Sequence, residues 1–69
     1  MLNLKEYVKK IVKMTLMNDV IVNAAIVDCE DDLHPDSGAR EQVIEIYDMD
    51  DKDFAFYYES DIKAIEVVK

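Results

Sequence analysis

Apolar residues recur at every second position in several separate segments, and this period constrains the fold more than any other feature of the chain. Val12, Met14 and Leu16 follow it, and Ile44 and Ile46 follow it again further on. Successive side chains of a β-strand point to opposite faces, so this spacing predicts strands with one buried face. The chain is therefore predicted to be mainly β.

The first residues and the connections complete the expected layout of a single domain over residues 1–69. Asn3 followed by Glu6 has the spacing of a capping box, and the apolar stripe after it has helical period, which predicts a short helix over about residues 3–10. Asn18-Asp19 is a tight-turn pair, and residues 30–39, with the only Pro and the only Gly, should form the longest loop. Strands are expected over about residues 11–17, 20–29, 40–48, 54–59 and 62–68.

The segment from Val20 to Cys29 is apolar at almost every position, with Asn23 and Asp28 as the exceptions. We expect this strand to be covered on both sides and to bend at Ala24 and Ala25, whose small side chains leave room.

Aromatic residues are concentrated in the later part of the chain, at Tyr47, Phe54, Phe56, Tyr57 and Tyr58. A platform for stacking bases would interleave them with Lys or Arg, which are missing here. The pattern therefore favours core and cross-strand pairs. Accordingly, we expect Phe56→Ala to cost roughly 2 to 5 kcal/mol.

The net charge of −8 is distributed unevenly. Between Asp28 and Asp61, thirteen carboxylates face only Arg40 and Lys52, so this segment carries −11. Such a field repels phosphate and attracts basic protein surfaces. A basic protein is therefore the expected partner, and nucleic acid is not.

Cysteine usage and hydropathy point to the cytoplasm. Cys29 is the only cysteine, so no intramolecular disulfide can form. No run approaches the roughly 18 consecutive apolar residues of a membrane helix, and the first ten residues lack a signal-peptide core. We expect a cytoplasmic protein that does not bind membranes.

The acidic run at residues 48–53 could be a metal loop or a turn. Asp48, Asp50 and Glu59 fall at positions 1, 3 and 12 of a calcium loop and are weak candidate ligands. However, Lys52 occupies a position that needs an oxygen ligand, and Asp53 occupies the position that needs Gly. The pattern favours a solvated hairpin tip and no bound metal.

Catalytic constellations are not evident in the sequence. Cys29 and His34 fall short of the four ligands of a structural zinc site. Ser37, Ser60 and Thr15 do not lie in a strand-to-helix elbow near a base. We therefore expect no cofactor and no enzymatic activity.

The chain resembles the Sm-like, SH3-like small β-barrels in four stretches. These are I-V-K-M-T-L-M-N-D-V-I-V-N-A-A-I-V-D, Q-V-I-E-I-Y-D, F-A-F-Y-Y and the closing D-I-K-A-I-E-V-V. The resemblance spans nearly the whole chain and implies a short helix followed by a five-stranded, strongly bent antiparallel barrel. The chain departs from this family at Asn23, Ala24 and Ala25, where a glycine usually permits the bend.

The resemblance also implies where a partner would bind. RNA-binding Sm-like proteins use the loops after their second and fourth strands, at one end of the barrel. Here those places hold carboxylates, whose sign is wrong for RNA. The expected protein-binding residues are Asp28, Glu30, Asp31, Asp32, Asp36, Glu59 and Asp61.

These features suggest a small, non-enzymatic acidic module that binds a basic protein surface. It is similar in size and layout to the acidic Rof-type Sm-like proteins, which bind the terminator Rho, and this implies a regulator or inhibitor of a nucleic-acid-binding protein. One alternative is a homo-oligomeric Sm-like protein, assembled through strand edges, with an RNA-related role through Lys5, Lys9, Lys10 and Lys13. A calcium-binding protein is a further alternative.

Overall fold

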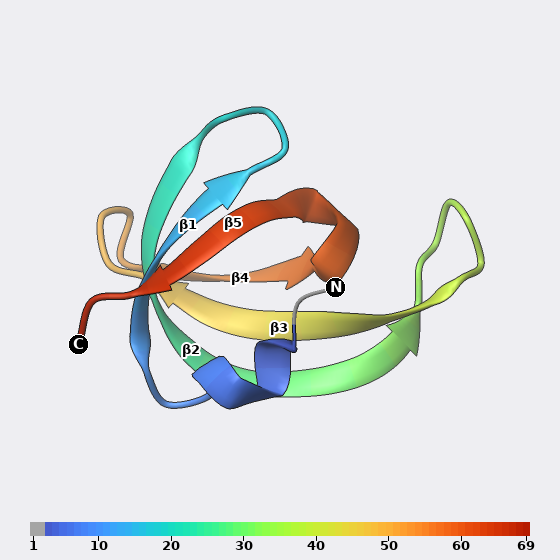
Figure 1. Cartoon of the computed structure of the whole chain (residues 1–69), viewed down its shortest axis with the longest axis horizontal. Helices are drawn as coiled ribbons and strands as arrows, with labels where there is room; N and C mark the ends of the chain where they lie inside the picture. Colours follow the sequence, from blue (N-terminus) through green and yellow to red (C-terminus); the bar gives the residue numbers. More distant parts are fainter. Residues whose placement is uncertain (1–2) are drawn as a thin grey trace.

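The computed structural model describes residues 3–69 and consists almost entirely of strands (Figure 1). The five strands form one antiparallel sheet in the order β4-β3-β2-β1-β5, which confirms the predicted mainly β class. Within these residues β4 and β5 are the two edges and do not pair with each other, so strand pairing does not close the sheet into a barrel. The elements are η1 (Leu4–Tyr7), β1 (Ile11–Leu16), β2 (Ile21–Leu33), β3 (Arg40–Asp48), β4 (Asp53–Tyr58), η2 (Glu59–Asp61) and β5 (Ile62–Val67).

The predicted helix over residues 3–10 is wrong, because η1 is a single 3₁₀ turn over Leu4–Tyr7. The side chain of Asn3 makes no capping hydrogen bond, and the amide of Leu4 instead donates to Oε1 of Gln42 at 2.9 Å. Lys9 has a φ of +68°, and its amide donates to the carbonyl of Ile26 at 2.8 Å. These contacts hold the segment against β2 and β3 and end the helix early. Within residues 3–69, no helix has the length and apolar character needed to cross a bilayer.

One hydrophobic cluster fills the inner face of the bent sheet. Val12 and Met14 of β1 contribute side chains without exposed surface, as their period predicted. Leu4 of η1 is also fully buried, so the 3₁₀ turn covers one part of the cluster. Its buried members are Leu4, Val12, Met14, Val22, Ala24, Ile26, Ile44, Ile46 and Ile62.

The central strand β2 is longer and less covered than predicted. It continues to Leu33, through residues that were expected to form a loop. Its inner positions before Val27 are buried, but Ile21 and Val27 remain 52% and 43% exposed, so the prediction that both sides are covered is wrong. The reason is architectural: in the described part of the chain, residues 3–69, no second layer covers the outer face of the single sheet (Figure 1).

A register shift interrupts the pairing of β2 with β3. Ile26 faces Ile46 and Asp28 faces Glu45, so Val27 is an extra residue in β2. Such a bulge changes which positions face inward. After it, Cys29 contacts the core, whereas Asp28 and Glu30 are exposed.

Candidate protein-binding surface

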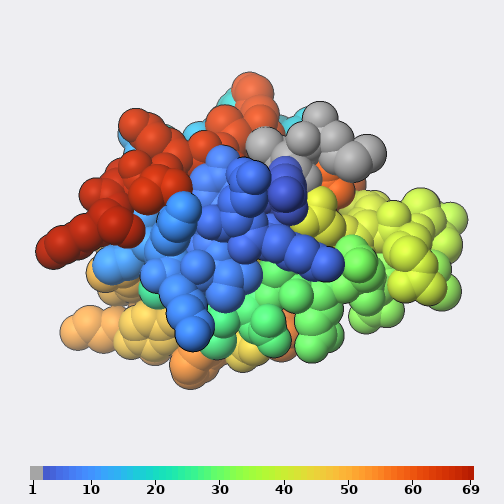
Figure 2. Space-filling model, turned by 60° about the horizontal axis from the view of Figure 1, so that its bottom comes forward, coloured from blue at the N-terminus to red at the C-terminus, as the bar shows by residue number. Residues whose placement is uncertain are grey.

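The second half of β2 and the start of β3 form an arm that extends beyond the rest of the sheet (Figure 1). β1 pairs with β2 only over Ile21–Ala25, and β4 pairs with β3 only from Val43 onward. Residues 31–33 and 40–42 therefore pair only with each other. We call residues 28–42 the acidic arm, and Figure 2 shows it (green to yellow) at one end of the molecule, beside the N-terminal segment (blue).

The predicted binding residues of the acidic arm divide between its two faces. Asp28, Glu30 and Asp32 lie on the outer face, opposite the outward positions of β3. Asp31 lies on the inner face, where its carboxylate is 3.8 Å from Nζ of Lys5. Asp36 is exposed in the loop between β2 and β3.

The two acidic segments that the resemblance places at one end do come together. Asp31 and Glu59 line the same hollow of about 320 Å³. The amide of Ser60 in η2 donates to Oε1 of Glu41 at 2.9 Å, which holds η2 against β3. Lys5 and Arg40 also line this hollow, and sequence reasoning missed them there. The buried Leu4 ties η1 to the core and brings Lys5 to this place.

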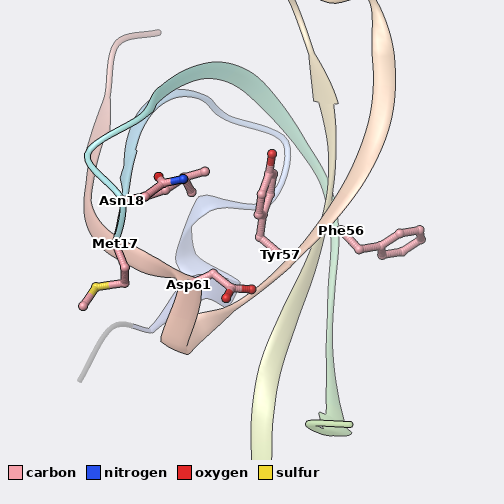
Figure 3. A pocket seen from close by; sticks show the side chains of 6 residues that line it. Met17, Asn18, Phe56, Tyr57 and Asp61 are labelled. Atoms are coloured by element: carbon pink, nitrogen blue, oxygen red, sulfur yellow. The ribbon is translucent and has the colours of Figure 1, made fainter. Parts of the chain in front are cut away.

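Asp61 lies apart from this hollow and supports the local fold. Its carboxylate accepts a hydrogen bond from the amide of Tyr58 at 3.0 Å, and its carbonyl accepts one from the amide of Met17 at 2.9 Å. It borders a different hollow, of about 430 Å³, together with Met17 and Tyr57 (Figure 3). This carboxylate therefore already has a role in the turn before β5.

Two groups of the acidic arm have shifted pKa values. Burial raises the pKa of the Cys29 thiol, Lys5 lowers it, and the carboxylates of Asp31, Asp28 and Glu30 raise it. The thiol is thus held in its neutral form, which is a weak nucleophile. The hydrogen bond from the Ser60 amide lowers the pKa of the Glu41 carboxyl, since it stabilises the charged form.

The three weak candidate metal ligands do not converge. Asp48 uses Oδ1 to accept hydrogen bonds from the amides of Asp50 and Asp51, at 3.0 and 3.1 Å, and so shapes the turn between β3 and β4. The carboxylate of Asp50 accepts from Nδ2 of Asn23 at 3.1 Å. Glu59 follows the other end of β4. The hairpin-tip interpretation is confirmed, and no group of three potential ligands is present within residues 3–69.

The aromatic residues of β4 face the opposite way from our prediction. Phe54 and Phe56 are 59% and 67% exposed, whereas Ala55 and Tyr57 contact the core. The expectation that Phe56 lies in the core, and that its truncation would cost 2 to 5 kcal/mol, is wrong. The alternation in β4 indicated which residues share a face but not which face is buried.

Comparison with protein-family models, curated proteins and solved structures finds no match to this chain. The class that the structure defines is a small five-stranded antiparallel sheet protein with an acidic arm.

Proposed function

We propose that the protein is a non-enzymatic acidic module of the cytoplasm that binds a basic protein surface and regulates or inhibits a nucleic-acid-binding protein. The observation that carries this proposal is the scarcity of cations beside its carboxylates. Of the thirteen carboxylates between Asp28 and Asp61, only Asp31 makes an ion pair among residues 3–69. That pair is exposed and worth little. The remaining charge is available to a partner.

The sheet supports the further proposal that the chain has an Sm-like, SH3-like architecture. All five strands are antiparallel, and β2, the longest, spans 13 residues in the middle of the sheet. The hollow shared by Asp31 and Glu59 lies where the resemblance expects a partner. In this proposal the small-barrel framework carries carboxylates where RNA-binding relatives carry RNA contacts.

Reversing the charge of the arm tests this proposal. The variant Asp31→Lys/Asp32→Lys changes two exposed residues of the arm, and Asp51→Lys/Glu66→Lys makes the same change of net charge at two exposed positions elsewhere. Both variants should fold, because exposed substitutions usually change stability by less than about 0.5 kcal/mol.

Each immobilised variant would be incubated with cell extract at about 50 mM and about 500 mM salt, since exposed charge interactions weaken as the Debye length falls. We expect the wild type and the control variant to retain basic proteins at low salt and to release them at high salt. The arm variant should lose them. Equal retention by both variants would reject the arm as the binding surface.

A second candidate function is a homo-oligomer with an RNA-related role. The outer edges of β4 and β5 both lack a strand partner within residues 3–69, so they could pair between copies. Lys5, Lys9, Lys10 and Lys13 are all exposed. Light scattering would give the mass of the assembly, and anisotropy of a labelled single-stranded RNA would measure binding. A monomer that leaves the RNA free would exclude this function.

A further inference from the structure

The outer face of the sheet brings an aromatic column next to a set of carboxylates. On this face Asp28 of β2 lies opposite Glu45 of β3, and Glu45 lies opposite Phe56 of β4. Paired strands are about 4.7 to 4.9 Å apart, so the three residues form one row across the sheet. With Glu30 and Val43 of the neighbouring row they line a hollow of about 250 Å³.

The aromatic side of this hollow is an uncovered ring. Phe54, Phe56 and Tyr58 are the outward residues of β4. Phe54 packs edge-on against Tyr47, with ring centroids 5.2 Å apart, and the centroids of the Tyr58 and His34 rings are 4.6 Å apart. Phe56 lies between them without a ring contact in residues 3–69, and it is the most exposed large hydrophobic residue there. Figure 3 shows its side chain pointing away from Tyr57 and Asp61.

The acidic side of the hollow lacks a counter-charge. Asp28 and Glu45 are direct cross-strand partners, an arrangement in which like charges destabilise a sheet. Neither Glu30 nor Glu45 makes an ion pair among residues 3–69, where the two ion pairs that exist are Lys5 with Asp31 and Lys63 with Asp19. Folding leaves this repulsion in place, and a cation in the hollow would relieve it.

The negative charge of the hollow and its exposed aromatic ring together favour an arginine side chain as the bound group. A guanidinium is planar, stacks on aromatic faces and donates two parallel hydrogen bonds to a carboxylate. Lysine offers the charge without the flat face, and a phosphate group would be repelled.

We propose that this hollow, the outer-face site, accepts an arginine side chain of a basic partner protein, stacked on Phe56 and paired with the carboxylates of Glu45 and Asp28. This proposal rests on the proposed function, since it names the contact that a basic partner would make. It differs from the arm proposal in requiring the ring of Phe56 as well as negative charge.

The probe would be a fluorescein-labelled peptide of arginines spaced by glycines, with one twin carrying lysines and another carrying neutral citrullines. Anisotropy would measure binding to the wild type, Glu45→Gln, Phe56→Leu and the control Asp51→Asn. Asp51 is exposed at the tip between β3 and β4, so the control removes one charge away from the hollow. Phe56→Leu keeps an apolar side chain but removes the ring.

We expect the arginine peptide to bind the wild type several-fold more tightly than the lysine twin, and the citrulline twin to bind least. Glu45→Gln and Phe56→Leu should each weaken the arginine peptide roughly three- to tenfold, whereas Asp51→Asn should change it less than about twofold. The Phe56→Leu variant should bind the arginine and lysine peptides with equal affinity. Amide shifts induced by the peptide should be largest at β3 and β4.

The outer-face site is refuted if arginine and lysine peptides bind alike, if Phe56→Leu has no effect, or if Asp51→Asn weakens binding as much as Glu45→Gln. The extract experiment separates the two proposals. If Phe56→Leu still retains basic proteins that the arm variant loses, only the arginine site fails. If the arm variant also retains them, the arm is rejected as the binding surface, and the proposed function fails if the wild type retains no basic proteins at low salt.

Discussion

The inner and outer faces of β2, β3 and β4 are built from the same alternating pattern but have opposite character. Inward positions such as Ile26 and Ile46 are almost without exposed surface. Outward positions include carboxylates such as Glu45 directly beside an exposed ring, Phe56. Burial explains the first face completely. On the outer face, repelling charges and uncovered rings do not help the chain to fold, which is why we propose this face as a binding surface.

The largest expected difference between the faces is in core truncation. Ile46→Ala removes a fully buried side chain from the inner face and should lower the free energy of unfolding by about 2 to 5 kcal/mol. For so small a domain that loss is a large part of the total stability. Urea denaturation followed by circular dichroism would measure it. Val43→Ala, at a half-buried outward position of the same strand, is the control and should cost clearly less.

Two adjacent residues of β4 provide a sharper comparison. Tyr57 packs against the core, so Tyr57→Ala should cost on the order of 1 to 3 kcal/mol. Phe56→Ala, at a 67% exposed position, should change stability by less than about 0.5 kcal/mol. Thermal unfolding of the two variants would decide which face is buried. The reverse ranking would mean that β4 faces the other way.

A smaller effect, of opposite sign, is expected from the like-charge pair. Glu45→Gln removes the repulsion between Glu45 and its cross-strand partner Asp28, and should raise stability by about 0.2 to 1 kcal/mol. The gain should shrink at high salt, where exposed charges are screened. Glu66→Gln is the control: its strand partner is Lys13, so the same change should not stabilise the protein. A loss of stability in Glu45→Gln would contradict the expected repulsion.

The smallest expected effect is a pH dependence at Glu41. The hydrogen bond from Ser60 lowers the pKa of this carboxyl below its ordinary value of 4.5. Because the folded pKa is the lower one, the stabilisation is present above the unfolded value and is lost as pH falls through the folded pKa. The melting temperatures of the wild type and Glu41→Gln should therefore converge on acidification. If the difference between the two melting temperatures stays constant as the pH falls, the hydrogen bond to Glu41 has no such effect.

Much of the fold could be predicted from local pattern, because period two is a direct consequence of strand geometry. The inward positions Val12, Met14, Ile44 and Ile46 were assigned correctly for this reason. The helix was not, since the contact of Leu4 with the core and the left-handed Lys9 outweigh the local capping signal. The outward direction of Phe56 depends on what covers the sheet, and local sequence does not encode that.

The candidate sites, like the fold, could be predicted from the sequence only in part. The accumulation of carboxylates from Asp28 onward was evident in the sequence, and the structure brings Asp31 and Glu59 to one hollow. The row formed by Asp28, Glu45 and Phe56 was not predictable, because it depends on strand register across a bulge. Register is a property of three strands together, whereas sequence periodicity describes one strand at a time.

The extra residue Val27 keeps the two halves of β2 in different phases. If Val27 instead stayed in the ladder opposite a residue of β3, strict alternation from Ile26 would send the side chains of Asp28, Glu30 and Asp32 toward the hydrocarbon interior, where ionised groups are hardly tolerated. Because Val27 bulges out of the ladder, the first part of this strand can serve as a wall of the interior and the second part as an ionised, water-facing ribbon. A chain lacking only Val27 would place Asp28 directly after Ile26 and keep the same side chains on the same faces, so the bulge accommodates one residue that the alternating pattern does not need.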